Sequence, residues 1–241
     1  MPSDFARGPF EGLQGGATAA LMCAAIASET AGFVTSATTH FLKPVPMTPL
    51  SVNVRPLRLG RRVSIVDAEL SSGDSVVAVQ RATLILPGDG ENLPTPPSQP
   101  ERPEDHPVET RRAAHGRPWL FDSMEVRRNC AGVVWFRQRV PIIETVCAMA
   151  QILPAADWAH GLGPPLGALV RPNVAIPNPD LAVHLFRPPR GEWIGVEHSS
   201  AWSSEAIGTG WGALRDTEGL IGRVAMSVAV ALLEDPASQG R

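Results

Sequence analysis

The 241-residue chain lacks several features that would point to particular classes of protein. Its three cysteines, Cys23, Cys130 and Cys147, show no Cys-x-x-Cys spacing, which argues against a disulfide framework and predicts reduced thiols. A formal net charge of −3 leaves no basic surplus for phosphates, so nucleic acid is excluded as a partner. No apolar run has the length of a membrane span, and the N-terminus lacks the order of a signal peptide. We therefore expect a cytoplasmic protein.

Familiar catalytic and cofactor motifs are also missing. Without a Gly-x-Ser-x-Gly sequence, a serine hydrolase of the nucleophile-elbow type is disfavoured. Residues 208–213 superficially fit a dinucleotide fingerprint, but they lie in strand-like sequence and open no helix. No His/Cys cluster has zinc spacing, so no metal site is expected.

The stretch at residues 13–29 predicts a helix that is buried on all sides, because small or apolar residues occupy nearly every position. Gly15 and Gly16 lie at its start, where free backbone N–H groups could bind an oxyanion or a thioester carbonyl. The alternative is that the glycine pair only turns the chain into the helix.

Alternating apolar and polar residues after this helix predict an antiparallel sheet, with strands at 34–41, 50–55, 62–70 and 75–86. Residues 87–117 are rich in proline and predict an extended linker. We thus expect a first domain at 1–88, a linker at 89–116 and a second domain at 117–236. In the second domain we expect a helix at 142–153, continuing or followed by another at 154–161, and strands at 119–128, 132–139, 181–186, 193–199, 208–214 and 220–233.

The two halves share sequence in the same order. Residues 40–44 (HFLKP) recur as residues 184–188 (HLFRP), an offset of 144. A glycine-led final strand recurs as 73–86 and 219–232, an offset of 146. Two matches at nearly one offset predict an internal duplication.

Several segments together resemble the double hot-dog acyl-CoA thioesterases, of the acyl-CoA thioesterase II type and its thioesterase-like relatives. The resemblance lies in residues 10–16 (FEGLQGG), 40–46 (HFLKPVP), 59–64 (LGRRVS), 155–158 (AADW), 180–188 (DLAVHLFRP) and 193–196 (WIGV). It implies an α+β tandem hot-dog, in which two antiparallel sheets are each wrapped around a long central helix and joined side by side. It also implies hydrolysis of acyl-CoA in lipid metabolism without a metal or organic cofactor. Two such molecules would pair as a dimer of double hot-dogs.

Carried over to this sequence, the family's catalytic aspartate falls on Asp157. Its partner hydroxyl residue, a threonine, falls on Asn178, and its glutamine falls on Met226, so two of the three positions differ. Asn178 can still donate and accept hydrogen bonds, whereas Met226 offers only a weak sulfur acceptor.

We expect Asp157 to activate water, while Gly15, Gly16 and Asn178 hold the thioester oxygen. The structural alternative makes Asp157 a helix cap before Trp158. A second function left open by Met226 is a non-hydrolytic acyl-CoA or lipid-binding protein.

Three other kinds of polar position have a structural alternative to a role in catalysis. His160 lies three residues after Asp157 and could carry a proton, as in hot-dog hydratases, but a surface or loop position is favoured. The repeated pair His40 and His184 favours a structural role. Gln80 is expected to face solvent or the seam between the sheets.

Overall fold

The computed structural model describes residues 2–9, 12–110, 116–145, 147–160 and 174–232. The first half contains α1 (Gly15–Glu29), β1 (Phe33–Phe41), β2 (Ser51–Arg58), β3 (Val63–Ser72) and β4 (Ser75–Ile85), after a short 3-10 turn, η1 (Asp4–Ala6). The second half contains η2 (Pro103–Asp105), η3 (Leu120–Ser123), β5 (Met124–Arg128), β6 (Val134–Gln138), α2 (Ala148–Ala156), η4 (Asp157–His160), β7 (Val174–Ala175), β8 (Asp180–Leu185), β9 (Trp193–Trp202), β10 (Ile207–Asp216), β11 (Gly219–Ala229) and β12 (Ala231–Leu232). Parts of five predicted segments lie outside the described residues: 10–11 of the first motif, 111–115 of the linker, 146 of the helix predicted at 142–153, 161 of the second helical segment and 233 of the last strand.

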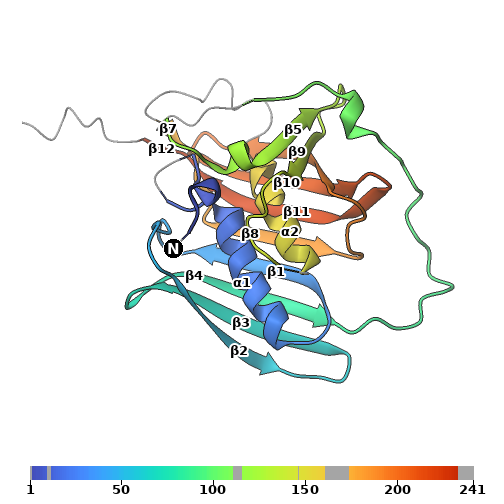
Figure 1. Cartoon of the computed structure of the whole chain (residues 1–241), viewed down its shortest axis with the longest axis horizontal. Helices are drawn as coiled ribbons and strands as arrows, with labels where there is room; N and C mark the ends of the chain where they lie inside the picture. The colour runs from blue at the N-terminus through green and yellow to red at the C-terminus, as the bar shows by residue number, and fades with distance from the viewer. Residues whose placement is uncertain (1, 10–11, 111–115, 146, 161–173, 233–241) are drawn as a thin grey trace, which may run out of the picture.

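Ten of the strands form one antiparallel sheet in the order β2-β3-β4-β1-β8-β11-β10-β9-β6-β5. The expectation of two antiparallel sheets joined side by side, each with a long central helix, is therefore confirmed in part. The sheet is continuous, and α2 has 9 residues against 15 in α1. Both helices lie side by side on one face of the sheet (Figure 1). Joining the halves in this way pairs two edge strands that would otherwise face water.

The seam between the halves is the pairing of β1 with β8. Thr38 pairs with Ala182, which lies 144 positions later and so at the offset of the repeated HFLKP and HLFRP segments. A residue that faces its own repeat counterpart across an antiparallel seam marks an approximate twofold axis. The register is thus the one that an internal duplication predicts.

The core lies between this face of the sheet and the two helices. Met22 and Ile26 of α1, Ile152 and Leu153 of α2, and Leu181 of β8 are fully buried. Side chains of α1 are buried or half-buried as far as Ala27, and the helix becomes exposed only at Ser28. Because the half-buried Leu21, Ala24 and Ala25 share one face, the prediction of a helix buried on all sides is confirmed in part.

The second half departs from the predicted elements before Asp157. Residues 120–123 form η3 rather than strand, because Trp119 N–H donates to Asp122 Oδ2 (3.1 Å) and Ser123 Oγ donates to the Leu120 carbonyl (2.7 Å). These local bonds turn the chain before β5 begins. Helix α2 begins at residue 148 rather than 142, after Thr145 Oγ1 accepts the Cys147 N–H (3.1 Å).

The proline-rich segment runs around the edge of the molecule in extended form, drawn in green in Figure 1. Its later part is attached to the second half, where Gln99 N–H and Glu101 N–H donate to the carbonyls of Glu218 and Thr217, both at 3.0 Å. Glu104 Oε1 accepts the indole N–H of Trp193 at 2.6 Å. The domain bounds 1–88, 89–116 and 117–236 stay a prediction. No helix in the described part of the chain is long and apolar enough to cross a bilayer.

Candidate functional site

Asp157 lies where the two halves of the molecule meet. It ends α2 and begins η4, and its side chain is turned toward the start of α1. The residue is 6% exposed. A carboxylate buried this deeply needs hydrogen-bond donors, since an unpaired buried charge is costly.

Three donors from other parts of the chain meet this carboxylate. Gln14 Nε2 donates to Oδ2 at 2.6 Å, and Asn178 Nδ2 donates to Oδ1 at 2.8 Å. The backbone N–H of Gly16 also bonds to the carboxylate. Asp157 is therefore held from the first half and from the segment before β8 together, and the alternative role of a local helix cap does not describe its contacts.

Gln14 is a site residue that the sequence analysis missed. It is the N-cap of α1, and its Oε1 accepts the Ala17 N–H at 2.7 Å while its Nε2 donates to Asp157. One amide thus caps a helix and orients the carboxylate. The available signal was a polar residue directly before a glycine pair at the start of a buried helix.

The glycine pair permits the close approach of α1 to Asp157. A Cβ at Gly15 would lie 2.9 Å from Asp157 Oδ2, and one at Gly16 would lie 2.2 Å from the Leu153 carbonyl oxygen. Because the Gly16 N–H already bonds to Asp157, Gly15 is left as the candidate donor for a substrate oxygen, and that role stays a prediction. Asn178 Nδ2 donates to the Asp180 carbonyl (3.2 Å) as well as to Asp157.

The surroundings of Asp157 favour the protonated, neutral form of its carboxyl more than water favours that form of an exposed aspartate. Burial raises the pKa of its carboxyl above the ordinary value, and His160 and the three hydrogen-bond donors act against that rise. Burial likewise lowers the pKa of the His160 imidazole, against the influence of Asp157 and of the Ile176 carbonyl.

His160 is partly buried rather than on the surface, which corrects the favoured expectation. Its Nδ1 lies 3.1 Å from the main-chain carbonyl of Asp157 and 3.1 Å from Met226 Sδ, and its Nε2 lies 3.2 Å from the Ile176 carbonyl. The ring therefore contacts the backbone of Asp157, an arrangement that gives no support to a hydratase-like Asp–His pair.

Met226 and Gln80 occupy corresponding positions of the duplicated final strand, 146 residues apart. Met226 contacts His160, as described above. Gln80 is 2% exposed and donates to Thr39 Oγ1 (2.8 Å) and to the Ala19 carbonyl (3.0 Å). The expectation that Gln80 faces solvent is therefore wrong, whereas its bond to Thr39 places its amide against β1, a strand of the seam.

The remaining candidates lie apart from this arrangement. His40 and His184 are exposed on the two seam strands, and their structural role stays a prediction. Within the described ranges, no group of three or more His, Cys, Asp or Glu residues is arranged to hold a metal ion.

Comparisons with known proteins agree with this architecture. An acyl-CoA thioesterase N-terminal domain model matches residues 6–85, and an acyl-CoA thioesterase C-terminal domain model matches residues 87–230. A search of curated proteins found no match.

Three solved structures are similar over nearly the whole chain. Acyl-CoA thioesterase II TesB2 from Mycobacterium marinum has a TM-score of 0.74 and 17% identity, covering 93% of this chain and 92% of its own. A protein of unknown function with a hot-dog fold from Alicyclobacillus acidocaldarius has a TM-score of 0.74 and 17% identity, covering 96% and 92%. The tesB protein from Mycobacterium avium subs paratuberculosis has a TM-score of 0.71 and 18% identity, covering 93% and 89%. At these identities the structural likeness shows the hot-dog fold, and the two domain models together show that the chain belongs to the acyl-CoA thioesterase family.

Proposed function

We propose that the protein hydrolyses acyl-CoA to the free acid and CoA, with a water molecule that Asp157 orients and deprotonates. The observation that carries this proposal is the buried Asp157 carboxylate, fixed by donors from both halves of the chain. A base in a fixed position contributes through both orientation and proton transfer.

Each contact of Asp157 has a part in this chemistry. Gln14 and Asn178 each donate to one oxygen of the carboxylate and so fix its plane. The oxygen lone pairs that accept no bond from these two side chains therefore point in a fixed direction. The raised pKa makes Asp157 a better proton acceptor than an exposed aspartate. Because both N–H bonds of Asn178 Nδ2 already have acceptors, its role here is to position Asp157 rather than to hold the thioester oxygen.

In the proposed reaction the water oxygen attacks the thioester carbonyl carbon while its proton passes to Asp157. The C–S bond then breaks, and the departing CoA sulfur takes the proton that Asp157 received, so that CoA leaves as the thiol and the carboxylate is regenerated. The negative charge on the carbonyl oxygen is assigned to the Gly15 N–H at the helix N-terminus, where the helix dipole favours an anion.

A second candidate function is binding of acyl-CoA or a related lipid without hydrolysis. Two observations favour it: both oxygens of Asp157 already accept hydrogen bonds from protein groups, and Met226 stands at the family's glutamine position. A carboxyl that is fully occupied and protonated would anchor the fold rather than activate water.

Turnover and binding measurements on one set of proteins separate the two functions. CoA release from short, long and aromatic acyl-CoA esters is measured for the wild type, for Asp157→Asn and for the control Asp67→Asn, a carboxylate on β3 that pairs with Arg81. Hydrolysis requires that Asp157→Asn lower kcat by about 10²–10⁴-fold and that Asp67→Asn leave it unchanged. Equal rates in all three proteins would remove Asp157 from the mechanism.

Calorimetric titration with a non-hydrolysable acyl-CoA analogue completes the test. Tight binding by a protein that releases no CoA supports the binding function instead. The pairing of two molecules and the cytoplasmic location stay predictions, and the sedimentation mass of the protein checks the first of them.

A further inference from the structure

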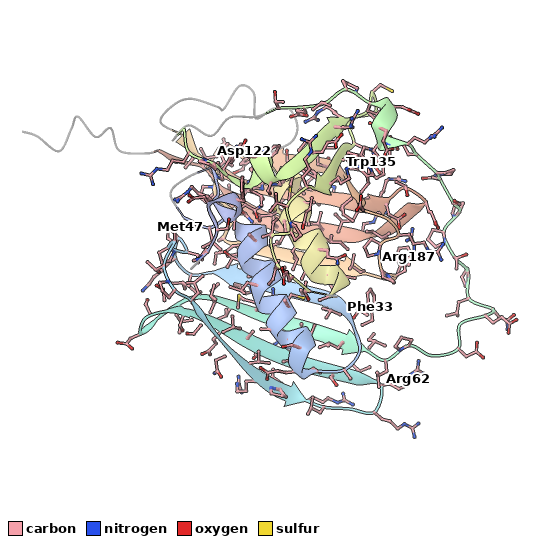
Figure 2. All side chains as sticks on the ribbon, viewed as in Figure 1. Phe33, Met47, Arg62, Asp122, Trp135 and Arg187 are labelled. Carbon is pink, nitrogen blue, oxygen red and sulfur yellow. The ribbon has the colours of Figure 1, made fainter. Side chains whose placement is uncertain are left out.

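The ends of α1 and α2 that lie away from Asp157 border a cavity of about 730 Å³. Its lining includes Ala24 and Ala27 of α1, Phe33 of β1 (labelled in Figure 2), and Thr145 and Cys147 at the start of α2. Val34 also lines it, and Asn178, 144 positions later, contacts Asp157. The cavity, which residues of both halves line, thus lies where the approximate twofold axis would place the counterpart of the Asp157 site.

Two of the three cysteines meet at the inner wall of this cavity. Cys147 Sγ lies 3.6 Å from Cys23 Sγ, and both residues are buried. Cys147 lines the cavity and is 7% exposed, whereas Cys23 lies behind it in the core and is 0% exposed. A small reagent in the cavity therefore meets Cys147 first.

The two sulfur atoms have different chemical environments. Cys147 is the N-cap of α2, and the backbone N–H groups of Ala150 and Met149 favour its thiolate. The Cys23 hydrogen bond lowers the pKa of Cys147 most, and together with these amides it brings that pKa to about 7 despite burial. The pKa of Cys23 is raised by its hydrogen bond to Cys147 and by burial. Both the access from the cavity and the N-cap position of Cys147 favour it over Cys23 as the nucleophile of the pair.

We propose that Cys23 and Cys147 are a redox-active dithiol, which hydrogen peroxide entering this cavity converts into a disulfide between α1 and α2. The Cys147 thiolate attacks one peroxide oxygen, so an S–O bond forms, the O–O bond breaks and hydroxide leaves. Cys23 sulfur then attacks the sulfenic sulfur: the S–S bond forms, the S–O bond breaks, and the departing hydroxide takes the Cys23 proton. Two thiols are oxidised, and one peroxide is reduced to two water molecules.

The geometry suits this step and this oxidant. A disulfide bond is ~2.05 Å long, and the two sulfurs are 3.6 Å apart, so they must approach by about 1.5 Å. Apart from Cys147, the ionisable residue among those that line the cavity is Glu144, whose negative charge disfavours anionic oxidants such as oxidised glutathione. Hydrogen peroxide is small and neutral.

The test measures mass and cross-linking in the folded protein. In a Cys130→Ala background, which removes the exposed thiol, peroxide treatment is expected to lower the intact mass by two hydrogen atoms, and dithiothreitol to restore it. Proteolysis without reductant is expected to yield one cross-linked peptide pair that contains Cys23 and Cys147. Unchanged mass of the folded protein, with reaction only after denaturation, would overturn the proposal.

Two further variants in the same background assign the roles. With Cys23→Ala, Cys147 is expected to accumulate as a sulfenic acid that dimedone traps, and then to oxidise further, because its partner thiol is gone. With Cys147→Ala, Cys23 is expected to stay unmodified at the same peroxide concentration. Equal labelling of Cys23 and Cys147 in these variants would contradict the assignment of Cys147 as the nucleophile.

Discussion

Gln14 and Asp157 are 143 positions apart in the sequence, yet Gln14 Nε2 lies 2.6 Å from Asp157 Oδ2. The same Gln14 side chain caps α1 through its Oε1, so the start of the first helix and the carboxylate of the second half are fixed by one amide. A change at Gln14 should therefore affect both the stability of the fold and the titration of Asp157.

Gln14→Ala removes the helix cap and one donor to the carboxylate. We expect the free energy of unfolding to fall by about 2–4 kcal/mol, as the sum of a lost N-cap and a lost hydrogen bond to a charged group. Gln14→Glu keeps an acceptor for the Ala17 N–H, so it should retain the cap while bringing a second carboxylate to Asp157. Urea denaturation of both variants measures the difference.

Gln14→Glu also tests the part that Gln14 has in catalysis. Like charges in contact disfavour ionisation, so the pKa of Asp157 should rise further. The acid limb of kcat/KM against pH should then move to higher pH while the fold is retained. An unchanged pH profile in a folded Gln14→Glu protein would show that the two side chains do not act together in solution.

The wild-type protein should lose acyl-CoA hydrolysis on the acid side at a pH above the ordinary aspartate value of ~3.9. In the proposed mechanism the ionised carboxylate of Asp157 is the base, and burial raises its pKa, so protonation removes activity at a higher pH than it would for an exposed aspartate. For stability the sign is opposite: a pKa that is raised in the folded state stabilises at low pH, and this contribution is lost as pH rises through the folded pKa.

Asp157→Asn should therefore lose less unfolding free energy than the wild type as pH rises from the ordinary aspartate pKa through the folded pKa of Asp157. Paired denaturation curves across the pH range check this. If the wild type instead gains free energy of unfolding over this pH range relative to Asp157→Asn, the hydrogen bonds outweigh burial and hold the pKa of Asp157 low.

Gly16→Ala should destabilise the helix pair. Its Cβ would lie 2.2 Å from the Leu153 carbonyl oxygen, which is backbone and cannot rotate away. Overpacking of this kind costs about 1–3 kcal/mol, which lowers Tm by about 2–4 °C per kcal/mol in a chain of this size. Gly90→Ala is the control, because its Cβ meets only Leu93 Cδ1 at 3.5 Å. Equal Tm values for the two variants would contradict the close packing of α1 against α2.

Met226→Gln tests whether the departure from the family glutamine limits the reaction. Because Met226 contacts His160, and Gln14 already supplies an amide to Asp157, the rate of CoA release should change far less than the ~10²–10⁴-fold expected for Asp157→Asn. Met226→Leu, which removes the sulfur but keeps the apolar character, is the matched control. A large gain in Met226→Gln alone would show that the thioether is what impairs catalysis.

Much of the fold could be predicted because its signals are local. Alternation over 62–70 and a Ser-Gly-Asp turn mark the β3–β4 hairpin, and its burial alternates as expected. Small apolar residues on every side of 15–27 marked a buried helix. The first residue of α2 could not be predicted from such a local signal, because the apolar residues from 142 onward are compatible with a loop as well as with a helix.

The candidate site depends on long-range packing, which for residues outside the glycine pair could be anticipated only through the family resemblance. Asp157 and Asn178 came from the resemblance, and the structure brings them into contact. Gln14 was missed because its two roles meet only when the halves are folded together. Gln80 was expected to face solvent because a polar amide in an apolar strand usually lies on the exposed face. In the fold it is buried, because the Ala19 carbonyl of α1 accepts its hydrogen bond.

The β1–β8 seam has a thermodynamic consequence. If the two halves were separate chains, the extent to which this seam formed would depend on protein concentration, as it does for any dimer. The covalent link between them replaces that dependence with a fixed effective concentration. Dilution therefore does not separate Thr38 from Ala182, and the seam keeps its register however little of the protein is present.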